Sequence, residues 1–390
     1  MKKNKDEINT TGYIEGYYGK LLSWDNRKLI VESLQKNNMN TYFYAPKEDE
    51  NHRLNWRNKY NLKWRKCFRD FTKFSKTNNI NVIAGIAPGL DFDFNKFNDK
   101  TQKNKSLDYT LLHNKAKQLL DDGATSISLL LDDIPEDFIN KFGNKISEGT
   151  SHGILANMLS ESLGRNIYFV PRIYADELID GEPYYLKDLS AVLNPKIKVF
   201  YCGKNVVSKT LTNYSKIRKV LCNKIVYWDN YYANDYCPRR FFIGPYIGRK
   251  KLNNVMVNPT GLIKTDLLIL DIVANNLNDK VFINKWKKIL ENHGVPFVFH
   301  TIKQYLLKPD FGSNPLLHSF DVNTKHIEAL DFLLWKWKGE LSREWYPYLF
   351  SLKHDLQLKL NILTSERLIK TQTLPLSEYV IQKLNKGELK

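Results

Sequence analysis

The stretch SISLLLDDIPEDF, residues 126–138, starts as an apolar strand and ends in two adjacent carboxylates, Asp132 and Asp133. The small and apolar side chains at its start are typical of a strand buried in a core. No lysine or arginine in the stretch can pair with the aspartates, and burial of an unpaired charge is costly. The pattern therefore indicates a functional site at the end of a buried strand, with helix capping, metal binding and acid/base chemistry as the alternatives.

Seven other runs have this strand-like character and alternate with amphipathic helical stretches. They are rich in β-branched and aromatic residues and cover residues 13–19, 40–46, 81–89, 167–174, 198–203, 225–230 and 254–259. Helix candidates lie between them, such as 24–37, which Ser23 can N-cap. Eight strands alternating with helices predict an α/β fold, a (β/α)8 TIM barrel. A doubly wound parallel sheet is the alternative, because strand order cannot be read from a sequence.

From Val273 onward helical patterns replace the strand-like runs. Apolar periodicity predicts helices at residues 282–294, 326–341, 341–363 and 377–386. We therefore expect two domains, a barrel over residues 10–272 and a C-terminal α-helical domain over residues 273–390. The helical domain has tryptophans and leucines to pack against the barrel or a second subunit, so we expect that a homodimer would form through it.

The composition excludes several classes of protein. With 42% hydrophobic residues among 390, the chain can bury a core, and it has no apolar run long enough for a membrane helix. The start of the chain lacks the apolar stretch of a signal peptide. The four scattered cysteines predict neither a disulfide framework nor a cysteine zinc site; they are Cys67, Cys202, Cys222 and Cys237. We expect a cytoplasmic protein that contacts no membrane and needs no cofactor.

A formal net charge of +17 raises the question of a nucleic-acid partner. Residues 1–264 hold 42 Lys and Arg against 28 Asp and Glu, whereas residues 265–390 hold 17 against 14. The basic residues are spread along helices and loops, with no Arg-rich block and no nucleic-acid-binding motif. This distribution favours a solvated basic surface over a polyanion-binding one, so we expect no nucleic-acid partner.

In a parallel barrel the C-terminal ends of the strands form one rim, where barrel enzymes carry their chemistry. Polar and aromatic residues collect at this predicted rim: Gly16, Lys47, Asp132, Asp133, Tyr174, Cys202, Trp228, Asn230, Asp235 and Asn258. Such a mixture suits a neutral sugar, because hydroxyls need paired donors and acceptors and sugar ring faces stack on aromatic rings.

Each rim residue also has a structural interpretation. Asp133 could N-cap a helix that begins at Pro135, which would leave Asp132 unexplained. Lys47 could be a solvated loop charge, Tyr174 a packing residue and Asn258 a turn residue. Two aspartates could also hold Mg²⁺ with waters, but no phosphate-binding glycine loop or paired histidines accompany them. We expect no metal site, and we expect His52 to be an exposed loop residue.

Several stretches together resemble glycoside hydrolase family 84, which contains protein O-GlcNAcases and bacterial β-N-acetylglucosaminidases of the hyaluronidase type. They are GYIEGYYG (12–19), NTYFYAPKEDENHRLNWR (40–57), IAPGLDF (86–92), LLLDDIPEDF (129–138), GKNVVSK (203–209), WDNYYANDY (228–236) and GPYIGR (244–249). They follow the family's order over roughly residues 12–260. The resemblance implies a (β/α)8 barrel, usually followed by a helical domain.

The resemblance also implies roles for individual residues. It places Asp132 on the aspartate that orients and polarises the substrate 2-acetamido group, and Asp133 on the general acid that later acts as a base. The other residues surround the sugar: Gly16 and Lys47 contact it from the first two strands, Asn230, Asp235 and Asn258 hold its hydroxyls, Trp228 forms an aromatic wall, Tyr174 lies near the acetamido pocket, and Val206 is an apolar contact. Departures such as Cys202, where relatives often have threonine, bear on aglycone preference more than on catalysis.

An adjacent acid pair suits a retaining mechanism in which the acetamido oxygen of the substrate is the nucleophile and forms an oxazoline. Repulsion between the two carboxylates is expected to keep one of them protonated near neutral pH. We therefore expect a retaining exo-β-N-acetylglucosaminidase that acts on protein-linked O-GlcNAc or a GlcNAc glycoside. A hyaluronan-type polysaccharide hydrolase of the same family and a catalytically silent sugar-binding barrel are the alternatives.

Overall fold

A computed structural model describes most of the chain as two compact units. The described residues are 9–98, 106–143, 145–179, 184–211, 217–237, 239–249, 252–275, 279–307, 321–360, 382–383 and 385–387. One unit lies within residues 1–235 and 246–282, and the other within residues 236–245 and 283–390. The predicted domain boundary at residue 272 stays a prediction.

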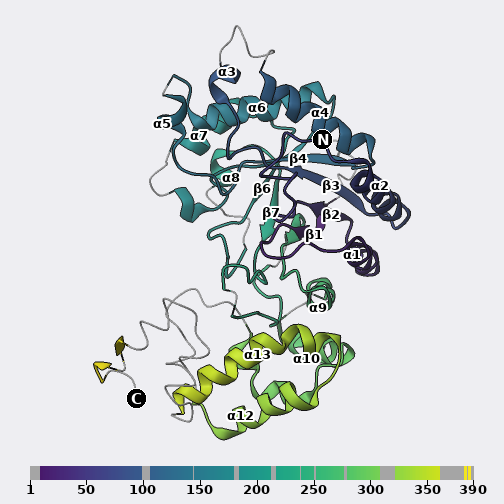
Figure 1. The fold of residues 1–390 in the computed structure, drawn as a ribbon, viewed down its shortest axis with the longest axis vertical. Helices are drawn as coiled ribbons and strands as arrows, with labels where there is room; N and C mark the ends of the chain where they lie inside the picture. The colour runs from purple at the N-terminus through teal and green to yellow at the C-terminus, as the bar shows by residue number, and fades with distance from the viewer. Residues whose placement is uncertain are drawn as a thin grey trace. The chain divides into compact units, whose positions relative to one another are not determined.

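Within the described part of the first unit, eight parallel strands close into a barrel in sequence order (Figure 1). They are β1 (Thr11–Glu15), β2 (Thr41–Tyr44), β3 (Asn81–Ile86), β4 (Ser126–Leu130), β5 (Tyr168–Val170), β6 (Lys198–Tyr201), β7 (Ile225–Asp229) and β8 (Val255–Val257). Tyr13 of β1 is aligned with Tyr42 on one side and with Val257 on the other, so the sheet has no open edge. This closure confirms the predicted (β/α)8 barrel and rules out the doubly wound sheet.

Helices join the strands around the outside of the barrel (Figure 1). They are α1 (Trp24–Lys36), α2 (Leu62–Thr77), α3 (Phe94–Asn98), α4 (Leu107–Asp121), α5 (Phe138–Phe142), α6 (Glu148–Ser162), the 3-10 helix η2 (Asp176–Ile179), α7 (Tyr185–Val192), α8 (Ile217–Val220) and α9 (Ile263–Ala274). As predicted, Ser23 caps α1 by accepting a hydrogen bond from the backbone N–H of Asn26. Asn61 and Ser106 cap α2 and α4 in the same way.

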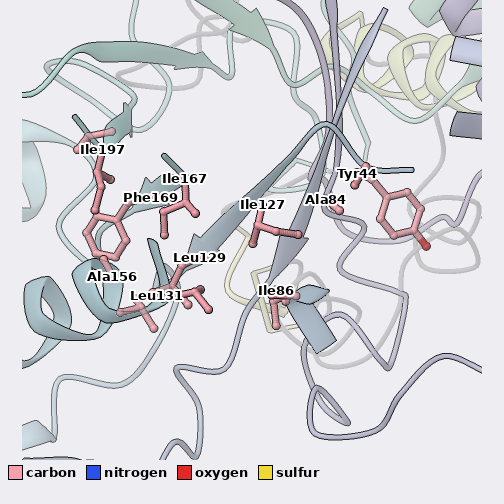
Figure 2. Packing of buried hydrophobic residues seen from close by; sticks show 14 of the residues in the cluster. Tyr44, Ala84, Ile86, Ile127, Leu129, Leu131, Ala156, Ile167, Phe169 and Ile197 are labelled. Atoms are coloured by element: carbon pink, nitrogen blue, oxygen red, sulfur yellow. The ribbon is translucent and has the colours of Figure 1, made fainter. Parts of the chain in front are cut away.

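Alternation of side chains divides each strand between two buried layers. Ile127, Leu129 and the following Leu131 belong to the layer between strands and helices (Figure 2). Leu130 instead belongs to a second cluster, which fills the inside of the barrel. Because successive strand residues point to opposite faces, Asp132 continues the inward row of Leu130. The strand register therefore directs this carboxylate to the mouth of the barrel.

The second unit is built from helices. They are α10 (Asp279–Asn292), which belongs to this unit from residue 283 onward, the 3-10 helices η3 (Phe297–Thr301) and η4 (Lys303–Tyr305), α12 (Thr324–Asp331), the π-helix η5 (Phe332–Lys336) and α13 (Glu340–Lys359). Trp345 is fully buried, with its ring centroid 4.8 Å from that of Phe241 and 5.5 Å from that of Phe299. The helical character predicted here is confirmed. The helix predicted over 326–341 is divided into α12 and η5, and the one predicted over 377–386 lies mostly outside the described residues.

Among the described helices, none combines the length and the apolar character needed to cross a membrane. The cytoplasmic location and the homodimer stay predictions.

Candidate active site

The residues predicted for the site lie at and beyond the C-terminal ends of the strands. Gly16 follows β1, Cys202 follows β6, Asn230 follows β7 and Asn258 follows β8. Each stands two positions after an inward-facing residue of its strand, so the period of two points it into the barrel mouth. Longer loops carry the others: Lys47 after β2, Asp132 and Asp133 after β4, Tyr174 after β5, Val206 after β6 and Asp235 after β7.

Lys47 connects the two aspartates. Its Nζ lies 2.7 Å from Oδ2 of Asp132 and 3.5 Å from Oδ2 of Asp133. The Lys47 side chain is only 2% exposed, so its interpretation as a solvated loop charge is wrong. Burial alone would lower the pKa of Lys47, but the two carboxylates outweigh burial and raise it. Lys47 therefore stays charged and partly neutralises the acid pair.

Asp133 is held from three loops. Its Oδ1 accepts a 2.8 Å hydrogen bond from the hydroxyl of Tyr174, and its Oδ2 accepts a 3.0 Å bond from the hydroxyl of Tyr18. Its backbone has a left-handed φ of 51°, which aspartate tolerates better than most residues. Arg53 donates from Nη2 to the Asp133 carbonyl oxygen at 2.6 Å, which fixes this turn.

The capping interpretation of Asp133 is wrong. Helix α5 begins at Phe138, not at Pro135, and its N-cap is Asp137. The carboxylate of Asp133 instead faces tyrosine hydroxyls and Lys47.

The groups around Asp133 act against the repulsion expected between the two acids, and protonation of one member of the pair stays a prediction. Burial raises the pKa of Asp133, but the charge of Lys47 and the hydrogen bonds from Tyr174 and Tyr18 outweigh burial, so its pKa lies below the usual range. Repulsion by Asp132 does not dominate, because Lys47 lies close to both carboxylates. The surroundings of Asp133 therefore favour its ionised form.

Asp132 has one engaged oxygen and one unengaged oxygen. Oδ2 accepts from Lys47, whereas the buried Oδ1 has no hydrogen-bond partner within the described part of the chain. A buried polar atom without a partner is costly and uncommon in folded proteins. The arrangement suits an N–H donor supplied by a ligand.

A second cluster is built from amides on the other side of the mouth. Asn258 accepts from the backbone N–H of Gly16 at 3.1 Å and donates to Oδ1 of Asn230 at 2.9 Å. That same Oδ1 accepts from the indole N–H of Trp228 at 2.9 Å. The Trp228 ring packs so close to Gly16 that a Cβ there would lie 2.4 Å from a ring carbon. Only glycine leaves room for this wall.

The remaining predicted residues complete this cluster. Asn230 donates from Nδ2 to the carbonyl oxygen of Val206 at 2.9 Å, and the same Nδ2 lies 3.6 Å from Sγ of Cys202. Asp235 accepts from the backbone N–H of Tyr18 at 3.1 Å through Oδ2. The mouth therefore presents fixed amide and carboxylate groups against an indole wall, in addition to the lysine-bridged acid pair.

Comparison with known proteins assigns this barrel to a family. Residues 11–266 match the model of the β-N-acetylglucosaminidase family. The chain belongs to this family of glycoside hydrolases. Protein O-GlcNAcases from rat and mouse are each 30% identical to it over 263 residues, which is 64% of this chain and 28% of the relative. The chain thus spans less than a third of the length of these curated relatives. The match confirms the resemblance drawn from the sequence motifs and includes every predicted site residue.

The β-N-acetylglucosaminidase barrel also contains site residues that the sequence analysis did not single out. Tyr18 and Arg53 contact Asp133, although both were within the quoted motifs. His52, expected to be exposed, is fully buried, and its Nδ1 lies 2.9 Å from the carbonyl oxygen of Gly85. Burial and the nearby Lys47 lower the pKa of His52 to about 3, so it is neutral. The sequence feature that could have identified Tyr18 and Arg53 is their place shortly after the predicted rim residues Gly16 and Lys47, as an aromatic and a basic residue.

Over the residues that the structure describes, no three His, Cys, Asp or Glu side chains are grouped to hold a metal ion.

Proposed function

We propose that the chain is a retaining exo-β-N-acetylglucosaminidase that removes terminal β-linked GlcNAc, with O-GlcNAc on protein as its substrate. Membership of the family supports the activity, and the relatives named Protein O-GlcNAcase support the substrate. The observation that carries the mechanism is the buried, unpartnered Oδ1 of Asp132 beside the Lys47–Asp133 contact. This oxygen would accept the N–H of the 2-acetamido group.

In the proposed reaction the nucleophile belongs to the substrate. The acetamido oxygen bonds to C1 while the C1–O bond to the leaving group breaks, and an oxazoline forms. Asp132 stabilises the positive charge that develops on the N–H, and a proton on Asp133 passes to the leaving oxygen. Water then attacks C1, gives a proton back to Asp133 and reopens the ring, so two inversions retain the β configuration. Because nucleophile and C1 are in one molecule, little entropy is lost in reaching the transition state.

The amide cluster would bind the sugar hydroxyls. Asn258 and Asn230 are already fixed by Gly16 and Trp228, so they need little reorganisation when a sugar enters. Trp228 offers an apolar ring to a pyranose face. Asp235 has a carboxylate oxygen on the same side of the mouth as the backbone of Tyr18, where it would accept from hydroxyls.

Release of 4-methylumbelliferone from its β-GlcNAc glycoside tests the activity. Turnover with retention of configuration at C1 is expected. No turnover by folded protein would contradict the proposal and favour a silent sugar-binding barrel. Cleavage inside a hyaluronan chain, with little release of terminal GlcNAc, would favour the polysaccharide hydrolase instead.

Fluorination of the N-acetyl methyl group is expected to slow hydrolysis with each added fluorine. The substituents withdraw electrons from the acetamido oxygen and make it a weaker nucleophile. A GlcNAc-derived thiazoline, which mimics the oxazoline, should bind on the order of 10²-fold or more tighter than substrate. Rates of the fluorinated glycosides and thiazoline inhibition constants check both points. A stable adduct of a 2-fluoro sugar on Asp132 or Asp235, found by mass spectrometry, would show a protein nucleophile and contradict the mechanism.

Asn258→Ala and Asp235→Ala are each expected to lower kcat/KM by the equivalent of roughly 1–4 kcal/mol of lost transition-state stabilisation. Truncation leaves sugar hydroxyls unpaired, and in Asn258→Ala it also frees Gly16 and Asn230 from their shared partner. The exposed Lys73 on α2 offers a control, because Lys73→Ala should leave kcat/KM unchanged. If Asp235→Ala matched this control, the proposed hydroxyl site would be misplaced.

A further inference from the structure

Tyr18 reaches across the mouth of the barrel from the loop after β1. Its backbone N–H donates to Oδ2 of Asp235 at 3.1 Å, and its hydroxyl donates to Oδ2 of Asp133 at 3.0 Å. The residue is 46% exposed, so its side chain borders solvent. Tyr18 therefore connects the side proposed to hold sugar hydroxyls with the side proposed to protonate the leaving oxygen.

The two oxygens of Asp133 are engaged in different ways. Oδ1 accepts from Tyr174, a partly buried residue after β5, whereas Oδ2 accepts from the more exposed Tyr18. A general acid must lie about 2.6–3.2 Å from the oxygen that it protonates. The Tyr18 oxygen, 3.0 Å from Oδ2, occupies such a position. A leaving oxygen that approaches Oδ2 along this direction would take the place of the tyrosine hydroxyl.

We propose that the Tyr18 hydroxyl occupies the position of the leaving oxygen beside Asp133 before substrate binds, and that the glycosidic oxygen displaces it when substrate binds. The inference rests on the proposed role of Asp133 as general acid. On displacement Asp133 takes up one proton from solvent at Oδ2. That proton moves to the glycosidic oxygen as the C1–O bond breaks, and the water that opens the oxazoline supplies the next one. Tyr18 is thus a positioning residue, and substrate binding itself leads to protonation of Asp133.

The other groups around Asp133 are built to stay in place. Lys47 is buried, Arg53 holds the Asp133 backbone rather than its carboxylate, and Tyr174 engages the other oxygen. Asp132, the adjacent negative charge, is paired with Lys47. Burial raises the pKa of Asp133, whereas Lys47, the two tyrosine hydroxyls and Arg53 lower it. Among these groups Tyr18 is the more exposed side chain, so its departure is the step that raises the affinity of Asp133 for a proton.

Tyr18→Phe tests the proposal through the pH dependence of hydrolysis of a phenyl β-GlcNAc glycoside, whose poor leaving group needs the acid. Activity falls at high pH as the acid loses its proton. Removing the Tyr18 hydrogen bond raises the pKa of Asp133 in the free enzyme, so the alkaline limb of kcat/KM should move up by as much as about one pH unit. The alkaline limb of kcat should not move, because Tyr18 is already displaced in the complex.

The pH profiles of Tyr18→Phe distinguish the proposed role of Tyr18 from the alternatives. An equal shift of the kcat limb would mean that Tyr18 still contacts the acid in the complex, and no shift in either limb would mean that its hydroxyl does not control the acid; both overturn the proposal. Tyr184→Phe is the matched control, because Tyr184 is 69% exposed and its side chain makes no capping hydrogen bond at the start of α7. It should shift neither limb, and melting temperatures should show that both variants fold.

A measurement without substrate distinguishes failure of the Tyr18 proposal from failure of the proposed function. Carbon-13 NMR can follow the Asp133 carboxyl, identified by its loss in Asp133→Asn. Tyr18→Phe should raise the pKa of this carboxyl whether or not GlcNAc glycosides are hydrolysed. An unchanged carboxyl pKa would overturn the inference while leaving the proposed activity intact. Inactive wild-type protein with a raised carboxyl pKa in the variant would instead count against the proposed function alone.

Discussion

Asp133→Asn is expected to slow hydrolysis of an alkyl β-GlcNAc glycoside by on the order of 10²–10⁴-fold, the usual worth of general acid assistance. A dinitrophenyl glycoside should lose far less, because its leaving group departs without a proton. Asp132→Asn should slow both substrates to a similar extent, since cyclisation of the acetamido group precedes or accompanies every departure. The measurement is the dependence of log kcat/KM on leaving-group pKa for both variants.

The structure makes asparagine a suitable replacement at Asp133. Its left-handed φ of 51° is one that asparagine also adopts readily, so the backbone held by Arg53 should be kept. Asp137→Asn is the control: Asp137 lies on the same loop and forms a surface pair with Lys141 at 2.9 Å, which contributes little. Equal sensitivity of both active-site variants to the leaving group would overturn the division of roles between Asp132 and Asp133.

Much of the fold could be predicted because strand patterns are local. Seven of the eight β-like runs contain one strand of the barrel, and the run 13–19 overlaps β1, which begins two residues earlier. The period of two then determines which side chains enter the mouth of the barrel. Gly16, Asn230 and Asn258 follow directly after strands, so their place at the rim follows from register. The closed strand order was an inference from strand number and chain length, because pairing between β1 and β8 joins residues far apart in sequence.

The loop residues of the site were harder to predict. Tyr18, Arg53 and His52 have side-chain directions set by irregular backbone, where neither a period of two nor one of 3.6 applies. His52 was assigned to solvent because charged neighbours surround it in sequence, yet it is buried against the carbonyl oxygen of Gly85. Burial of a loop side chain depends on the strand that it covers, which the local sequence does not contain.

The ionisation of Asp133 shows a further limit of sequence reasoning. Adjacency predicts repulsion between two aspartates, but the sign of the pKa shift depends on what lies between them. Lys47 comes from 85 positions before Asp132 in the chain and still makes a 2.7 Å contact with it. The predicted rim included Lys47, but the sequence does not show that its side chain lies beside the two aspartates.

Lys47→Met is expected to lower the free energy of unfolding by about 3–5 kcal/mol, because it leaves a buried carboxylate without its cation. The pair is desolvated on both sides, with 2% of the Lys47 side chain and 8% of the Asp132 side chain exposed. Activity should fall as well, by roughly 10²–10³-fold in kcat/KM, because the same Lys47–Asp132 contact is proposed to orient Asp132 in the transition state. Denaturant unfolding and kinetics of the folded fraction check the two effects.

A double-mutant cycle separates charge burial from catalysis. In Lys47→Met/Asp132→Asn the buried charge is absent, so stability should recover toward that of Asp132→Asn alone. Activity should not recover, because the carboxylate proposed to stabilise the acetamido N–H is gone. Strong coupling in stability without rescue of kcat/KM is the expected pattern. Lys73→Met on the exposed side of α2 controls for loss of one positive charge and should change neither quantity. If the two stability losses simply added, the 2.7 Å contact between Lys47 and Asp132 would not be the interaction that stabilises this pair in the mouth of the barrel.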